Sequence, residues 1–272
     1  MLVDGGPTAR VLAGGTDVIV QARERTRDID LFIDVKHLPE TMALSYDPAE
    51  GLTVGAAVPC YKIYGNEHVQ QHYPALVEAT SIIGGTAIQG RATLGGNLCN
   101  SSPAADTIPA MMVLECVAHI AGPDGERDVA VEEFCTGPGA NVLQAGEFVV
   151  SIGFPAPTAG SGAAWQRFIP RNEMDIAVVN AASQVRFDGD VVSWARVAIG
   201  AVAPTPLLVA EAAEALVGGP LTDETVAAAA AASGAAARPI ADMRGSIKQR
   251  NHLAVVLTER TLRQAAEQAR GS

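Results

Sequence analysis

The chain has 272 residues, of which 48% are hydrophobic and 18% are charged, which excludes a disordered polymer and allows a large core or several modest domains. The net charge is −11, with 19 basic residues spread among 30 acidic ones, so the basic cluster that nucleic-acid binding requires is missing. No cysteine forms a Cys-x-x-Cys pair, and no apolar run approaches the roughly 18 residues of a membrane span. The opening residues, MLVDGGPTAR, lack the apolar segment of a secretory signal. We therefore expect a cytoplasmic protein without a nucleic-acid partner or a membrane span.

The first 155 residues alternate short apolar runs with glycine pairs and helical patterns. Thr16 is a candidate N-cap for the first helix because its hydroxyl can accept from the first-turn amides. In chain order the pattern predicts a strand at 10–13, a helix to residue 25, strands at 31–35 and 52–57, a helix at 74–82, a strand at 91–94, a helix at 105–114, and strands at 116–121, 128–131 and 148–154.

The segment 155–162 (PAPTAGSG) is typical of a connection between structural units. Beyond it the pattern predicts long strands at 163–169, 177–187 and 191–201, followed by helices at 208–217, 222–232 and 253–269. Asp188-Gly189 between the last two strands is a strong hairpin signal. The whole chain is therefore expected to have an α+β fold.

The first motif with chemical potential is a glycine pair, Gly14-Gly15, between a predicted strand and a predicted helix. Backbone amides there are not shielded by a Cβ atom, and they lie beside the positive end of a helix dipole. That arrangement suits a phosphate or pyrophosphate. An ordinary tight turn would explain the same residues.

A second motif runs from Thr93 through Gly95-Gly96 to Asn97, and Ser-Pro-Ala-Ala-Asp follows it, ending at Asp106. The glycines permit close approach of the backbone to a ligand, and Asn97 offers an amide group. A loop followed by a capped helix is the structural alternative.

A third region, 167–177, places five charged residues between two apolar runs. It is either a solvated loop or a loop that reaches a ligand bound by the first half. No G-x-G-x-x-G fingerprint, phosphate loop, H-E-x-x-H helix or nucleophile elbow is present.

The three motifs in this order resemble the FAD-binding medium subunit of the molybdenum hydroxylases, the xanthine dehydrogenase and carbon monoxide dehydrogenase family. The resemblance extends over nearly the whole chain. It implies the FAD-binding fold of the vanillyl-alcohol oxidase type, in which two subdomains enclose FAD, followed by a C-terminal domain of sheet and helices. The implied ranges are 1–57 and 58–155 for the subdomains and 163–272 for the C-terminal domain. Relatives usually have an extra strand and helix before the first glycine loop, so the first subdomain is expected to be smaller or truncated at its start.

The resemblance also implies which residues bind the cofactor. The first loop is expected to contribute Val11, Leu12, Ala13, Gly14, Gly15, Thr16, Asp17 and Val18, and the second loop Thr93, Gly95, Gly96 and Asn97. Single residues expected near the flavin are Ile83, Asp106, Val149, Arg167, Asp175 and Ile176, of which Arg167 stands where relatives often have a lysine. No catalytic acid or base and no metal ligand is expected on this chain.

The implied function is electron transfer. FAD, bound non-covalently, would receive electrons from [2Fe–2S] clusters on a small subunit and pass them to an external acceptor. A large molybdopterin subunit would hydroxylate the substrate, and the complex would be a dimer of heterotrimers. Two alternatives remain at this point: a self-contained flavin oxidoreductase of the same fold, or a non-catalytic scaffold that binds a nucleotide or phosphate through its glycine turns.

Overall fold

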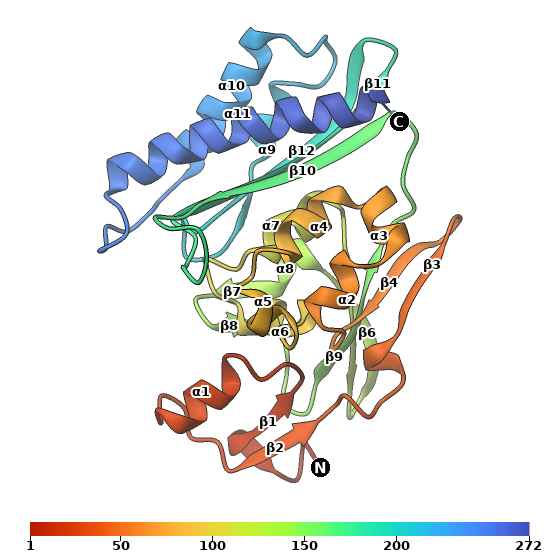
Figure 1. Cartoon of the computed structure of the whole chain (residues 1–272), viewed down its shortest axis with the longest axis vertical. Helices are drawn as coiled ribbons and strands as arrows, with labels where there is room; N and C mark the ends of the chain where they lie inside the picture. The colour runs from red at the N-terminus through yellow and green to blue at the C-terminus, as the bar shows by residue number, and fades with distance from the viewer. Residues whose placement is uncertain (272) are drawn as a thin grey trace.

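A computed structural model describes residues 1–271. Figure 1 shows three parts along the longest axis of the molecule: a small N-terminal part, a middle part, and a C-terminal part in which helices lie over a sheet. The mixture of helices and sheets confirms the expected α+β fold.

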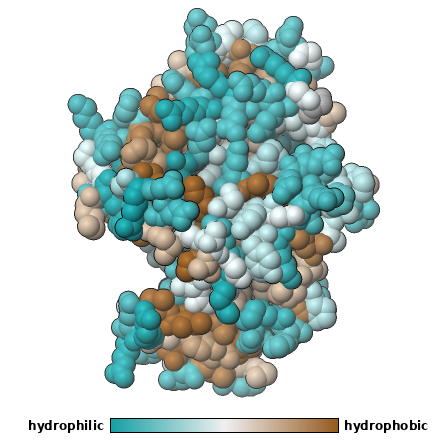
Figure 2. Space-filling model, in the orientation of Figure 1, coloured by the Kyte–Doolittle hydropathy of each residue, from teal (hydrophilic) through white to brown (hydrophobic). Residues whose placement is uncertain are grey.

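The N-terminal part is a two-stranded parallel sheet with one helix. Strand β1 (Ala9–Leu12) follows the short helix η1 (Gly6–Thr8) and pairs with β2 (Leu31–Asp34), and α1 (Val18–Arg23) lies between them in the chain. Parallel strands need such a crossover connection. Apolar side chains remain exposed on this part, among them Ile19 and Phe32. Figure 2 shows brown surface at the bottom of the molecule, where this part lies in Figure 1.

The middle part is built on a five-stranded antiparallel sheet in the order β3-β4-β9-β5-β6. Its strands are β3 (Leu44–Asp47), β4 (Gly51–Gly55), β5 (Val117–Gly122), β6 (Gly125–Ala130) and β9 (Phe148–Phe154), and a small pair is formed by β7 (Cys135–Gly137) and β8 (Ala140–Asn141). The helices are η2 (Glu40–Met42), α2 (Cys60–Tyr64), α3 (Glu67–His72), α4 (Pro74–Thr80), α5 (Thr86–Gln89), α6 (Leu94–Asn100), α7 (Thr107–Val113) and α8 (Val131–Phe134). Leu76, Leu98, Met111 and Ile152 are among the fully buried side chains of its core.

The C-terminal part is a four-stranded antiparallel sheet, buried on both faces. It consists of β10 (Ser161–Phe168), β11 (Val179–Asp188), β12 (Val191–Gly200) and β13 (Leu207–Leu208), with α9 (Ala210–Glu214), α10 (Asp223–Ala236) and α11 (Ile247–Gly271). Because successive side chains of a strand point to opposite faces, Trp165 and Ala182 join the core of the middle part, whereas Ala164 and Ala181 join the core under the helices. Because both faces of the sheet are apolar, the sequences of these strands are long continuous hydrophobic runs.

The strand β10 lies at the edge of this sheet and packs on α4 and α11. Its free backbone amides find side-chain acceptors on those helices: the Trp165 N–H donates to Glu78 at 2.7 Å, and the Ala163 N–H donates to Gln268 at 3.2 Å. Unpaired edge amides would otherwise be left buried without an acceptor. The C-terminal sheet is thereby attached to the middle part.

Several local predictions need correction. The predicted strand at 91–94 is wrong: only an isolated bridge from Thr93 to Pro59 forms, and Gly95 and Gly96 lie in the first turn of helix α6. The hairpin after β11 is confirmed, but its two-residue turn is Gly189-Asp190, one residue later than predicted. Thr16 is not the N-cap of α1, which begins after Asp17. The pattern also missed β3, α2 and α3.

No helix within residues 1–271 is long and apolar enough to cross a membrane.

We expect Gly162→Ala to destabilise the protein by about 3 kcal/mol, because overpacking of a close backbone contact is costly. A Cβ atom at Gly162 would lie 2.1 Å from the Ala265 carbonyl oxygen of α11 and 2.6 Å from the Ala269 nitrogen. Gly219→Ala is the matched control, since a Cβ atom there meets nothing within 4 Å. Urea unfolding of both variants measures the difference; equal stabilities would show that α11 does not pack closely on β10.

Candidate FAD site

A cavity of about 650 Å³ lies between the N-terminal part and the middle part. This volume is within the range of about 300–1,000 Å³ that small-molecule sites occupy. Both glycine loops contribute to its wall, as do the N-terminal segment and the region around β8 and β9. Of the predicted site residues, the following line it: Val11, Ala13, Gly14, Gly15, Thr16, Asp17, Val18, Ile83, Thr93, Gly95, Gly96, Asn97 and Val149.

The two glycine loops touch each other at Gly14. The Arg91 Nε donates to the Gly14 carbonyl at 2.8 Å. A Cβ atom at Gly14 would lie only 2.1 Å from the Arg91 carbonyl oxygen, so the two backbones meet where a larger residue could not fit. Gly15 has φ +82°, a conformation that favours glycine. The contact brings motifs about 80 residues apart onto one cavity wall.

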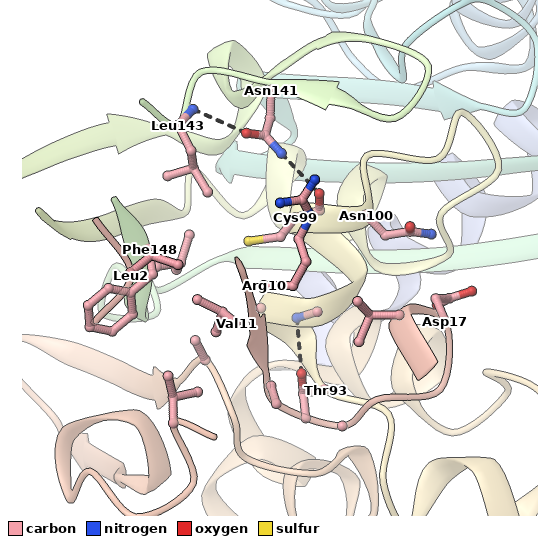
Figure 3. A pocket seen from close by; sticks show the side chains of 18 of the residues that line it. Leu2, Arg10, Val11, Asp17, Thr93, Cys99, Asn100, Asn141, Leu143 and Phe148 are labelled. Carbon is pink, nitrogen blue, oxygen red and sulfur yellow. Dashed lines mark hydrogen bonds between the residues drawn. The ribbon is translucent and has the colours of Figure 1, made fainter. Parts of the chain in front are cut away.

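The second loop enters helix α6 at Thr93, whose hydroxyl accepts a hydrogen bond from the Gly96 amide at 3.0 Å (Figure 3). A Cβ atom at Gly95 would lie 2.5 Å from the Cβ of Ala56, so this glycine permits α6 to pack against the chain that follows β4. The Asn97 side-chain oxygen accepts from the Thr107 amide and hydroxyl, which fixes the orientation of its NH2 group beside the cavity. The glycine at position 95 therefore serves packing.

Sequence reasoning missed two parts of the wall. One is the N-terminal segment with Arg10, and the other is the stretch from Gly139 to Phe148. In Figure 3, Asn141 donates to the Cys99 carbonyl and accepts from the Leu143 amide, which ties this stretch to α6. Gly139 and Gly146 both have positive φ, so the two glycines were a sequence signal for turns. Nothing in the local sequence showed that these turns face the glycine loops.

The charged and nucleophilic groups of the cavity are few. Arg10 and Arg27 line it, and Arg27 donates to the Gly139 carbonyl at 3.3 Å. Burial raises the pKa of Asp17 at the start of α1, which favours the neutral acid over a carboxylate. Burial also raises the pKa of the Cys99 thiol to about 12, so this thiol stays protonated and is a poor nucleophile.

Five predicted residues do not line the cavity. Leu12 lies in β1, and its carbonyl accepts from the Val35 amide. Asp106 and Arg167 form a buried ion pair at 2.7 Å. Burial raises the pKa of Asp106 to about 6 although Arg167 opposes that shift. Asp175 pairs with Arg244 at 3.3 Å, and Ile176 is 52% exposed. Their contact with a cofactor stays a prediction.

Comparison with known proteins identifies the family of the chain. Residues 1–157 match the family model described as the FAD binding domain in molybdopterin dehydrogenase, and residues 166–265 match that of the CO dehydrogenase flavoprotein C-terminal domain. The chain belongs to the FAD-binding medium subunits of the molybdenum hydroxylase family. FAD is therefore its cofactor, and the protein is an oxidoreductase subunit of a multi-subunit enzyme.

The chain matches individual relatives along almost their entire length. The chain is 31% identical to the xanthine dehydrogenase FAD-binding subunit of Escherichia coli O157:H7, covering 99% of this chain and 93% of the relative. The structure of carbon monoxide dehydrogenase from Hydrogenophaga pseudoflava superposes with a TM-score of 0.93 at 30% identity, covering 97% of this chain and 91% of the other. Quinoline 2-oxidoreductase from Pseudomonas putida 86 gives a TM-score of 0.90 at 29% identity, covering 98% and 92%.

In this family FAD lies on the medium subunit, while molybdopterin and the iron–sulfur clusters belong to other subunits. The expected recognition, fold and cofactor are thus confirmed. The cavity of this subunit fits FAD: the four glycines of the two loops lie along its wall, two arginines line it, and apolar Val11 and Val149 supply surface for rings.

We expect Gly14→Ala to weaken both folding and FAD binding, because its Cβ atom would push the two loops apart at a cost on the order of 3 kcal/mol. Gly96→Ala is the matched variant. Gly96 is exposed, and a Cβ atom there would meet only the Thr93 hydroxyl, at 2.9 Å. The Thr93 hydroxyl must shift to make room, and a weakened cap costs about 1 kcal/mol. Alanine favours a helix by about 1 kcal/mol over glycine, which offsets this cost, so Gly96→Ala should lose FAD affinity but little stability.

Urea unfolding and FAD titration of both variants distinguish the two effects. A Gly14→Ala variant of wild-type stability would refute the close contact of the loops.

The Glu147 carboxylate, on the cavity wall, accepts two hydrogen bonds of 2.7 Å from Arg127, and they lower its pKa from 4.5 to about 2. The folded state therefore binds this proton more weakly than the unfolded chain. We expect wild type to be more stable than Glu147→Gln at pH 7, with the difference fully present above pH 4.5 and lost as the pH falls towards 2.

Unfolding titrations across this range, repeated in an Arg127→Gln background, provide the test. In that background most of the pH dependence should disappear, because only the Gln144 amide then still donates to Glu147. An undiminished difference would assign the pH dependence to another group.

Proposed function

We propose that this chain binds FAD non-covalently between the two glycine loops and that it conducts electrons from the [2Fe–2S] clusters of a partner subunit to an external acceptor. The observation that supports the proposal most directly is the contact of Gly14 with Arg91, because it places both loops on one cavity. FAD supplies the redox chemistry when bound, and the protein supplies binding, orientation and a defined electrostatic environment.

The pyrophosphate of FAD is assigned to the region where the loops meet. Residues of the first loop, from Gly14 to Asp17, and of the second, from Gly95 to Asn97, line the same cavity. Amides that precede and begin a helix favour anions. Arg10 adds a cation on the same wall.

Apolar residues are assigned to the ring systems of the cofactor. Ile83, Val11 and Val149 line the cavity, and Figure 3 shows Leu2 and Phe148 beside one another at its apolar end. Rings buried against such side chains contribute hydrophobic binding energy of about 25 cal/mol per Å² of apolar surface.

Non-covalent attachment follows from the groups that the cavity presents. The wall residues within the described chain include no histidine, and the thiol of Cys99 is held protonated by burial. A covalent link to the flavin would need a nucleophile that is ionised or easily deprotonated.

The partners in this proposal are a molybdopterin-binding large subunit and a small subunit with the iron–sulfur clusters, assembled as a dimer of heterotrimers in the cytoplasm. The support comes from relatives named as medium chains of carbon monoxide dehydrogenase and as an FAD-binding subunit of xanthine dehydrogenase. The expected residue ranges of the domains, 1–57, 58–155 and 163–272, belong to the same proposal.

We expect the purified chain to contain FAD at one molecule per chain and to release it unchanged on acid precipitation. After removal of the flavin, FAD should bind about a hundredfold more tightly than FMN, because FMN lacks the second phosphate and its two or more charge-assisted hydrogen bonds of about 1.5 kcal/mol each. Flavin fluorescence titrations measure both constants.

Metal analysis of the same sample tests the subunit assignment. Molybdenum and iron should co-purify only with the complete complex. Equal affinity for FAD and FMN would contradict the pyrophosphate site, and stoichiometric iron on the isolated chain would contradict the electron-transfer assignment.

A further inference from the structure

A second cavity, of about 710 Å³, lies between the middle part and the C-terminal part. Its wall is formed by the junction of α3 and α4, the turn after α7, the connection 155–162, strand β11 and the end of α11. Figure 1 shows this connection beside the end of α11, close to the C-terminus. Within residues 1–271, no residue lines both this cavity and the FAD cavity, so the two are separate.

The connection that borders the second cavity is held near both of its ends. The Tyr73 hydroxyl donates to the Pro155 carbonyl at 2.9 Å, and the Phe187 amide donates to the Gly160 carbonyl at 2.9 Å. Pro155 and Pro157 restrict the backbone between these anchors, because the proline ring fixes φ. This part of the wall is therefore preformed, as the walls of small-molecule sites usually are.

Two buried polar groups of strand β11 lack hydrogen-bond partners at this cavity. Gln184 is 9% exposed, and its side-chain oxygen accepts no hydrogen bond. The Nε atom of Arg186 is buried and finds no acceptor. Both residues line the cavity, and because they are two positions apart in a strand, their side chains lie on the same face of the sheet. Buried polar groups are rarely left unsatisfied, so this acceptor and this donor indicate a ligand.

The Arg186 guanidinium is fixed by its other contacts. It donates to the Glu115 carboxylate at 2.7 Å, and its central carbon lies 3.9 Å from the centre of the Trp194 ring. The free Nε–H group therefore has a defined direction. Among the described wall residues, Glu115 carries the one carboxylate and Arg186 the one guanidinium. Because these two charges neutralise each other, the wall favours a neutral ligand over an ion.

We propose that the second cavity binds a neutral cyclic amide, whose N–H group donates to the Gln184 oxygen and whose carbonyl accepts from the Arg186 Nε–H. A cyclic amide presents both groups on one edge, as two side chains from the same sheet face require. Its ring carbons suit the apolar part of the wall, where Pro74, Leu114 and Pro155 lie. This inference does not depend on the proposed FAD site.

The cyclic amide δ-valerolactam is the probe, and cyclohexanone is the matched control compound. Cyclohexanone has the same ring size and the same carbonyl group, but a methylene group replaces the N–H group and leaves the Gln184 oxygen unpaired. We expect δ-valerolactam to bind with a dissociation constant on the order of a millimolar, as suits a ligand of this size. Cyclohexanone should bind about tenfold more weakly, the equivalent of one hydrogen bond. NMR titrations of the isotope-labelled chain measure both constants and follow the side-chain signals of Gln184 and Arg186.

Two variants test the two contacts separately. Gln184→Met removes the acceptor at similar size, so δ-valerolactam should lose about tenfold in affinity, whereas cyclohexanone should change by less than about twofold. Arg186→Lys keeps the charge that pairs with Glu115 but lacks the fixed Nε–H donor. Since both compounds have a carbonyl group, both should bind Arg186→Lys about tenfold more weakly.

Gln166→Met is the matched control variant. Gln166 also lies in a strand of the C-terminal sheet, and its side chain donates to Gln264 at 2.8 Å, but it does not line the second cavity. Both compounds should bind this variant with wild-type affinity.

The wild-type chain alone can overturn the proposal, so the test does not depend on the folding of any variant. Equal affinity for the two compounds would do so, as would signal shifts confined to residues outside the second cavity. An absence of δ-valerolactam binding at millimolar concentrations would leave water as the occupant and would also overturn it. Saturating FAD should leave both constants unchanged, and competition with FAD would instead place the compound in the FAD cavity.

Discussion

The contact between the backbone of Gly14 and that of Arg91 is the constraint on which the cavity depends. At this point a Cβ atom would lie 2.1 Å from a carbonyl oxygen, and a guanidinium bond of 2.8 Å holds the same two loops together. The N-terminal sheet of two strands has little core of its own. Its attachment to the middle part through this contact places residues of both loops on one cavity wall.

The C-terminal part packs on the middle part through its sheet. Its edge strand β10 is fixed by Glu78, which accepts from the Trp165 amide, and the same strand ends at Arg167. Burial of the sheet on both faces leaves this strand little freedom to shift. The position of Arg167 against Asp106 is therefore a consequence of packing over the whole sheet.

Sequence patterns predicted those parts of the fold that local chemistry determines. The long strands of the C-terminal sheet follow from continuous apolar runs, and the order of the glycine motifs led to the family and to the part of the wall that the two glycine loops form. Gly95 and Gly96 misled, because glycine is unfavourable in helices, yet both lie in α6, where Gly95 permits packing on Ala56. Arg10 and the stretch around Asn141 were missed because their place on the wall depends on contacts far away in the chain.

The central claim is that both glycine loops hold one FAD molecule. Hydrogen exchange of the backbone amides, measured by mass spectrometry with and without FAD, tests it most directly because exchange reports local protection. The account predicts that FAD slows exchange in peptides covering 13–18 and in those covering 93–98, while α10 exchanges at the same rate in both samples. Protection of only one loop, or protection centred on the C-terminal helices, would contradict it.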